Sequence, residues 1–158
     1  MSSASQLLAL SRENATMIAL AESCTGGLIA AALTDLAGSS AMFDRGFVTY
    51  TNAAKIQMLG VSAQTLSDHG AVSEQVAAQM AQGALTRSDA TIALSVTGIA
   101  GPGGSDHKPE GRVCFGVATS DGTITQTRDF GALGRAQVRQ ATVNHALTLL
   151  IQTASSQK

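Results

Sequence analysis

Two short apolar runs, each followed by a loop of hydroxyl residues and glycines, constrain the fold of this chain most strongly. The first run is "TMIALAES" at residues 16–23, and the second, residues 90–96, leads into "TGIAGPGG" at residues 97–104. A short apolar run between polar turn residues is typical of a strand that is covered on both faces. We therefore predict that both runs are buried strands of a sheet with helices on each side.

The other predicted elements surround these two strands. Residues 42–51 favour a strand, and "SDG" at residues 120–122 predicts a hairpin between strands at 111–119 and 123–130. Apolar residues at helical spacing predict helices within residues 4–12, 25–36, 52–60, 62–70, 73–88 and 135–152, with Asn52 as the cap of the third. The predicted fold class is α/β, a single three-layer α/β/α domain over residues 1–158 with a mixed, mainly parallel sheet and a late antiparallel hairpin.

Composition argues against several classes of protein. The formal net charge is −1 and the basic residues form no runs, which argues against nucleic-acid and anionic-membrane partners. Cys24 and Cys114 lie far apart and outside metal-ligand spacing, so neither a disulfide scaffold nor a metal site is expected. No window is apolar enough to span a membrane, and the first residues lack a signal-peptide pattern. We expect a soluble, cytoplasmic protein with a small-molecule partner.

The loops that follow the two apolar strands form the predicted ligand site. In open α/β sheets, ligands collect beyond the carboxyl ends of the strands, where helix N-termini present backbone N–H groups. Residues 22–27 and 97–104 both have this setting. The second loop matches neither of the common phosphate-binding patterns, GxxxxGK[ST] and GxGxxG. Its glycines alone therefore predict no particular ligand.

The first loop also offers candidate nucleophiles. Ser23, Cys24 and Thr25 all lie where a helix N-terminus can assist an attacking oxygen or sulfur atom. A serine in this place is also typical of a helix cap, so Ser23 has both a structural and a catalytic interpretation. Cys24 is the alternative nucleophile. None of the histidines falls in a Ser/His/Asp pattern.

Lys55, in the stretch "TYTNAAK", is the candidate base for a serine nucleophile. A lysine held among apolar neighbours such as Ile56 and Met58 loses solvation, which lowers its pKa and leaves a neutral amine that can accept a proton. Serine with lysine is a known alternative to serine with histidine. Tyr50 precedes Lys55 by five residues and is expected to orient or relay the proton. The spacing leaves open whether the three side chains meet.

Taken together, "AESCTGG", "GFVTYTNAAK", "SVTGIAGPGG" and "KPEG" closely resemble the CinA C-terminal domain family, the nicotinamide-nucleotide amidases. The likeness covers residues 7–151. It implies hydrolysis of the carboxamide of nicotinamide mononucleotide to nicotinic acid mononucleotide and ammonia, without a metal or organic cofactor. It also implies a three-layer α/β/α fold, a homodimer or larger homo-oligomer, and here the stand-alone form of a domain that is often fused to another.

The resemblance assigns roles to individual residues. Ser23 matches the nucleophile, Lys55 the general base and Tyr50 the tyrosine that accompanies them. The implied substrate-binding residues are Thr25, Gly26, Gly27, Thr97, Gly98, Gly101, Gly103, Arg135 and Arg139. The two arginines are four residues apart, so they share one helical face and can meet a phosphate.

Several points remain open at the level of sequence. The loop "KPEGRV" departs from the family's usual KPVG, which leaves the roles of Lys108, Glu110 and Arg112 undecided. Backbone N–H groups near Gly26 and Gly27, or in the loop that begins at Thr97, are the candidates for stabilising an oxyanion. Two alternative functions are an amidohydrolase for another carboxamide and a non-catalytic nucleotide-binding module.

Overall fold

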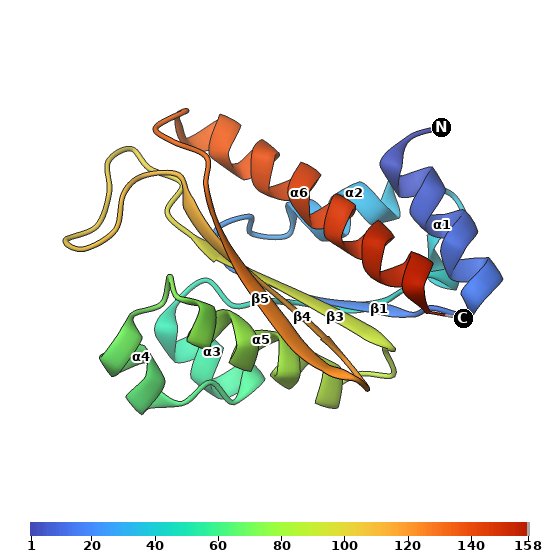
Figure 1. The fold of residues 1–158 in the computed structure, drawn as a ribbon, viewed down its shortest axis with the longest axis horizontal. Helices are drawn as coiled ribbons and strands as arrows, with labels where there is room; N and C mark the ends of the chain where they lie inside the picture. Colours follow the sequence, from blue (N-terminus) through green and yellow to red (C-terminus); the bar gives the residue numbers. More distant parts are fainter. Residues whose placement is uncertain (158) are drawn as a thin grey trace.

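Helices cover both faces of one five-stranded sheet in the computed structural model, which describes residues 1–157 (Figure 1). The strands are β1 (Ile18–Glu22), β2 (Phe43–Val48), β3 (Ile92–Gly98), β4 (Arg112–Thr119) and β5 (Gly122–Asp129). The helices are α1 (Ser3–Asn14), α2 (Leu28–Thr34), α3 (Asn52–Leu59), α4 (Ala63–His69), α5 (Glu74–Thr86) and α6 (Arg135–Ser156), with a 3₁₀ turn at Ser39–Ala41. Helices α1, α2 and α6 lie on one face and α3, α4 and α5 on the other, which confirms the predicted layers (Figure 1).

The strand order is β2-β1-β3-β4-β5, and the sheet is mixed as predicted. Strand β1 runs parallel to both β2 and β3, whereas the β3–β4 and β4–β5 pairs are antiparallel. Only β4 therefore runs against the other strands, although parallel and antiparallel pairs are equal in number. The late hairpin is β4–β5, joined where the sequence reads "SDG".

The two apolar runs form adjacent central strands. Every residue of β1 is buried, as is all of β3 except Gly98. Side chains alternate between the two faces of a strand: Ile18 and Leu20 join the core under α6, while Ala19 and Ala21 join the core under α5. Because β1 and β3 are parallel and in register, the loops that follow them leave the sheet side by side.

Helix α3 lies close to the end of β2. It begins at the predicted residue, but its cap is Thr51, whose hydroxyl accepts a hydrogen bond from the Ala54 N–H at 3.1 Å. The predicted cap, Asn52, is instead the first residue of the helix. Gly60 ends α3 in the left-handed conformation, as expected of a glycine stop. This short helix places Lys55 on its first turn.

None of the helices within residues 1–157 combines the length and hydropathy needed to cross a bilayer.

Candidate active site

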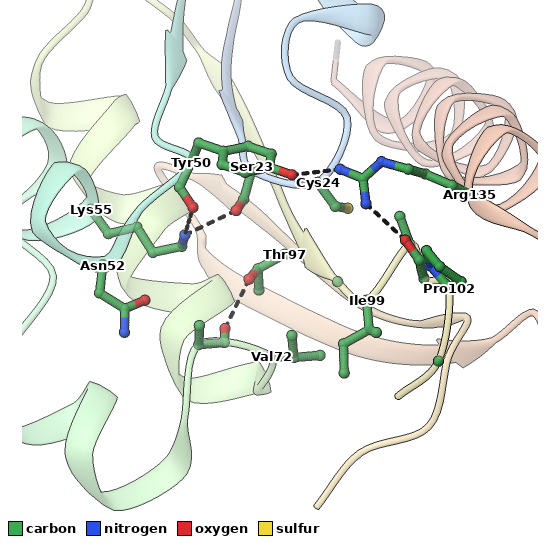
Figure 2. Close-up of a pocket in the computed structure, with 15 residues that line it drawn as sticks. Ser23, Cys24, Tyr50, Asn52, Lys55, Val72, Thr97, Ile99, Pro102 and Arg135 are labelled. Atoms are coloured by element: carbon green, nitrogen blue, oxygen red, sulfur yellow. Dashed lines mark hydrogen bonds between the residues drawn. The ribbon is translucent and has the colours of Figure 1, made fainter. Parts of the chain in front are cut away.

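The ends of β1 and β3 and the segment between β2 and α3 surround one pocket of about 340 Å³ (Figure 2). Ser23 lines this pocket directly after the end of β1, and Thr97 is the second-last residue of β3. Lys55 reaches in from α3, and Arg135 lies at the start of α6. Four segments that are distant in sequence therefore contribute side chains to the same cavity.

Ser23 and Lys55 are in direct contact. The Lys55 Nζ atom lies 2.9 Å from the Ser23 Oγ atom, and both residues are buried, with 7% of Ser23 and 1% of Lys55 exposed. The same Nζ donates to the carbonyl oxygens of Thr49 at 2.9 Å and Tyr50 at 3.2 Å. Figure 2 shows the lysine amine between the serine hydroxyl and the Tyr50 carbonyl. The sequence-predicted pair is thus brought together.

The surroundings of Lys55 make its ammonium easier to deprotonate than that of an exposed lysine. Burial lowers the pKa of Lys55 below its ordinary value. None of the salt bridges among residues 1–157 involves this lysine. A neutral amine has two N–H bonds and one lone pair, and the two carbonyl acceptors use both N–H bonds. In that neutral state the lone pair would accept from the Ser23 hydroxyl, whereas in the protonated state the third N–H donates to Ser23 Oγ across the same 2.9 Å contact.

The neighbours expected to bury Lys55 are themselves exposed. Ile56 and Met58 are 39% and 42% exposed, so they do not form the environment of the amine. Lys55 is buried because its side chain points inward from α3 to the end of β1 (Figure 2). The predicted desolvation of the Lys55 amine is present, but it arises because the side chain points into the protein and not because Ile56 and Met58 cover it.

The loop that carries Ser23 is organised by the buried carboxylate of Glu22. It accepts hydrogen bonds from the Thr25 hydroxyl (2.6 Å) and from the N–H groups of Gly27 (3.2 Å), Ile29 (3.0 Å) and Ala30 (3.0 Å). A buried charge is costly unless such bonds compensate it, and the N-terminus of a helix also favours a negative charge. Glu22 therefore joins the end of β1 to the start of α2.

The interpretation of Ser23 as a helix cap is wrong. Helix α2 begins at Leu28, later than predicted, and its cap is Gly27 with a φ of 109°. Glu22 supplies the capping hydrogen bonds, which leaves the Ser23 hydroxyl to Lys55. The N–H of Gly26 bonds to the Ser23 carbonyl oxygen at 3.1 Å and that of Gly27 to Glu22, so neither is free for an oxyanion.

Replacing Glu22 with glutamine is expected to lower the free energy of unfolding by about 2–3 kcal/mol, because the amide NH₂ faces N–H groups that need an acceptor. Urea denaturation measures this change. Glu74→Gln is the matched control: its carboxylate accepts two bonds, from the Thr125 and Thr127 hydroxyls at 2.7 Å each, and its loss is expected to cost about 1 kcal/mol or less. Equal effects of the two substitutions would contradict the role assigned to Glu22.

Tyr50 contacts the pair through its backbone. Its carbonyl oxygen accepts from Lys55, whereas its hydroxyl accepts from Arg135 Nη2 at 2.6 Å, and the side chain is 55% exposed. Arg135 also donates from Nη1 to the Gly101 carbonyl oxygen at 2.8 Å. None of the salt bridges among residues 1–157 involves Arg135. The pocket therefore carries a guanidinium that is bonded only to neutral acceptors.

Arg139 lies one helical turn beyond Arg135 but outside the pocket. Its Nε donates to the Cys24 carbonyl oxygen and its Nη2 to the Thr25 carbonyl oxygen, each at 3.1 Å. These two hydrogen bonds stabilise the loop that carries Ser23. Among the predicted substrate-binding residues, the pocket is lined by Thr97, Gly98, Gly101, Gly103 and Arg135 and not by Thr25, Gly26, Gly27 and Arg139.

Further lining residues were not named individually from the sequence. Ile99, Ala100 and Pro102 lie within the predicted loop at residues 97–104, whereas Asn52, Ala71 and Val72 lie outside both predicted loops. Asn52 was interpreted only as a cap. Ala71 and Val72 reach the pocket through tertiary contacts, because the Thr97 hydroxyl donates to the Ala71 carbonyl oxygen at 2.9 Å and the Lys108 amine donates to that of Val72. Lys108, undecided at the level of sequence, thus supports one wall of the pocket.

Cys24 also lines the pocket but is unsuited to attack. Burial raises its pKa to about 11, so its sulfur is a thiol near neutral pH. The thiolate is the reactive form of cysteine. The charge of the Cys24 thiolate raises the pKa of Lys55, but burial, which lowers it, is the larger cause.

Comparisons with known proteins agree on one family. Residues 1–154 match the CinA C-terminal domain. The nicotinamide-nucleotide amidohydrolase PncC of Enterobacter agglomerans is 56% identical over 135 residues, which cover 84% of this chain and 82% of that protein. PncC of Escherichia coli K12 is 51% identical over 145 residues, 91% of this chain and 87% of that protein. The crystal structure of the competence/damage inducible protein CihA from Agrobacterium tumefaciens superposes with a TM-score of 0.92 at 52% identity, covering 95% and 92% of the two chains.

Proposed function

The chain belongs to the CinA C-terminal domain family, and we propose that it hydrolyses the carboxamide of nicotinamide mononucleotide to nicotinic acid mononucleotide and ammonia. Relatives at 51% and 56% identity are named nicotinamide-nucleotide amidohydrolases. The observation that carries the proposal is the buried contact of 2.9 Å between Ser23 Oγ and Lys55 Nζ inside an open pocket. Such a pair is suited to covalent hydrolysis of an amide.

In the proposed first step, the neutral Lys55 amine takes the hydroxyl proton of Ser23 while Oγ attacks the carboxamide carbon. The carbonyl π electrons move to oxygen and form a tetrahedral oxyanion. The Cys24 N–H is the candidate donor to this oxyanion, because Cys24 follows the nucleophile, lines the pocket and donates its N–H to no other residue within 1–157. Of the two donor sets expected from the sequence, Gly26 and Gly27 are engaged, and the loop that begins at Thr97 is kept as the second candidate.

The second step releases ammonia. The Lys55 ammonium returns its proton to the amide nitrogen, the C–N bond breaks, and Ser23 is left as an ester of the nucleotide's acyl group. Lys55 is neutral again. It then takes a proton from water, whose oxygen attacks the ester carbon, and the proton passes to Ser23 Oγ as the acid product leaves. One base therefore serves both halves of the reaction.

The phosphate of the substrate is proposed to bind Arg135. Its present partners, the Tyr50 hydroxyl and the Gly101 carbonyl oxygen, are neutral, and a phosphate would replace them with charged acceptors. Thr97, Gly98, Gly101 and Gly103 are proposed to line the path between phosphate and carboxamide. Tyr50 is proposed to act twice, orienting Lys55 by its carbonyl and Arg135 by its hydroxyl.

Self-association in the cytoplasm is a further proposal that follows from the family resemblance. The exposed large apolar side chains that could contact another chain include Leu28, Val48, Ile56, Met58, Ile124 and Leu133.

Comparing three substrates tests the proposed function. Ammonia release from nicotinamide mononucleotide is expected to exceed that from nicotinamide riboside by about 100-fold in kcat/KM, the effect of one charge-assisted contact to phosphate. Free nicotinamide is expected to be poorer still. Equal or faster turnover of the riboside would favour an amidohydrolase for another carboxamide. Binding of the mononucleotide without ammonia release would favour a non-catalytic module.

A further inference from the structure

Glu110 joins two segments that border the pocket. It lies in the loop between β3 and β4, and its Oε1 accepts from the Gly103 N–H at 2.6 Å. Its Oε2 accepts from the N–H of Gly134, the cap residue of α6, at 3.1 Å. The residue after Gly134 is Arg135. One carboxylate thus ties the glycine-rich turn to the backbone that carries the pocket's guanidinium.

The glycine-rich turn and the segment that leads into α6 are both exposed to solvent. Residues 102–107 and 131–137 are exposed, and Gly103 and Gly134 have φ values of 79° and 92° that favour glycine. Figure 1 shows the β3–β4 loop reaching beyond the sheet beside the segment that leads into α6. Exposed loops with few buried contacts open at low free-energy cost. Side-chain bonds between these two loops therefore help to hold the rim of the pocket, together with the backbone bond from the Phe130 N–H to the Gly111 carbonyl oxygen at 2.9 Å.

Two side chains supply such bonds, and they act on the same turn. Arg135 donates to the Gly101 carbonyl oxygen, while Glu110 accepts from Gly103 two residues later. The Glu110 stem also lies against Gly101: a Cβ atom on that glycine would come within 2.5 Å of Glu110 Cδ. Glu110 does not line the pocket itself. It therefore acts on the pocket through Gly101 and Arg135 rather than by touching what binds there.

Given the proposed function, on which the inference rests, we infer that Glu110 is a positioning residue for the substrate's phosphate. It holds the glycine-rich turn and the start of α6 together, so that Arg135 is preorganised for an anion. Glu110 is one of the residues at which this sequence departs from the family's usual KPVG pattern, and the hydrogen bonds of its carboxylate give it this positioning role. Its effect falls on substrate affinity, because neither Ser23 nor Lys55 contacts it.

The same carboxylate has one alternative role, which is to block phosphate binding. Backbone N–H groups at a helix start and in a glycine turn can bind phosphate, and Glu110 occupies two of them. A blocking carboxylate would weaken phosphate binding, whereas a positioning carboxylate strengthens it. The positioning role is favoured because the two carboxylate oxygens of Glu110 accept hydrogen bonds from two separate segments and so hold those segments together. The two roles predict opposite changes in KM.

The test measures kcat and KM for nicotinamide mononucleotide and nicotinamide riboside with Glu110→Gln. The amide keeps the size of the side chain but turns a donor toward one of the two N–H groups. KM for the mononucleotide is expected to rise about tenfold with kcat within about twofold, while kcat/KM for the riboside stays within about twofold. Glu110→Asp, which keeps the charge with a shorter reach, is expected to give an intermediate KM. Asp129→Asn is the control, since it breaks the nearby Arg112 pair at 2.8 Å outside the pocket and should leave KM unchanged.

A lower or unchanged KM in Glu110→Gln would overturn the inference, as would an equal rise in KM for the riboside. A fall in kcat without a rise in KM would overturn it as well. Measurements on the wild-type protein distinguish failure of this inference from failure of the proposed function. If it releases no ammonia from the mononucleotide, the proposed function is contradicted, whereas turnover with an unchanged KM in Glu110→Gln contradicts only the role of Glu110.

Discussion

Replacing Ser23 with alanine is expected to reduce kcat for ammonia release from nicotinamide mononucleotide by about 1,000-fold or more, the usual effect of removing a nucleophile. The Ser23 hydroxyl is the one that contacts the Lys55 amine. Cys24→Ala is the matched control, because the pKa of its buried thiol is raised to about 11 and the reactive thiolate is scarce near neutral pH. Cys24→Ala is expected to keep kcat within about tenfold of the wild type.

A coupled assay for ammonia measures both variants at saturating substrate. Circular dichroism and urea denaturation check that each variant is folded. Activity of Ser23→Ala close to that of the wild type would remove the serine from the mechanism. Loss of activity in Cys24→Ala, with Ser23→Ala active, would transfer the role to the thiol.

Replacing Lys55 with methionine is expected to cause a loss of similar size, about 1,000-fold in kcat, because no other base within residues 1–157 contacts Ser23. Methionine fills nearly the same volume without an amine. Lys55→Arg is an informative second variant, since a guanidinium stays protonated and cannot accept the serine's proton. Both variants are expected to bind the mononucleotide, so calorimetry separates the loss of catalysis from the loss of binding.

The pH dependence follows from the direction of the Lys55 pKa. Burial lowers this pKa, and the reaction needs the neutral amine, so kcat/KM should rise with pH and level off below the ordinary pKa of lysine. Folding stability has the same sign: the unfolded chain binds this proton more tightly, so stability rises with pH between the folded and unfolded pKa values. Lys55→Met should abolish that rise. A rate that falls as pH increases through this range would contradict a neutral lysine base.

The layered fold could be predicted because its signals are local. The runs that form β1 and β3 are apolar, short and followed by glycines, and "SDG" joins β4 to β5. The start of α2 could not be predicted in this way. Its capping bonds come from Glu22, a residue still within the preceding strand, whereas local patterns place a cap directly before the helix. The same missed contact produced the mistaken capping role for Ser23.

The site could be predicted only in part, because local motifs do not determine contacts between distant segments. Motifs that occur together led to Ser23 and Lys55, but spacing does not determine the direction of a side chain. Tyr50 follows the end of β2, where the alternation of a strand no longer applies, and its hydroxyl points to Arg135 instead of Lys55. The wall at Val72 and the bridge at Glu110 depend on contacts between distant segments, which no local pattern contains.

Trapping the acyl group with hydroxylamine tests the central claim most directly. An ester on Ser23 can be attacked by hydroxylamine in place of water, which gives the hydroxamate of the nucleotide and frees the serine. We predict that the wild-type protein, incubated with nicotinamide mononucleotide and hydroxylamine, releases ammonia and forms both the acid and the hydroxamate, and that Ser23→Ala forms neither. Ammonia release with the acid as the sole product at saturating hydroxylamine would contradict an acyl-enzyme on Ser23.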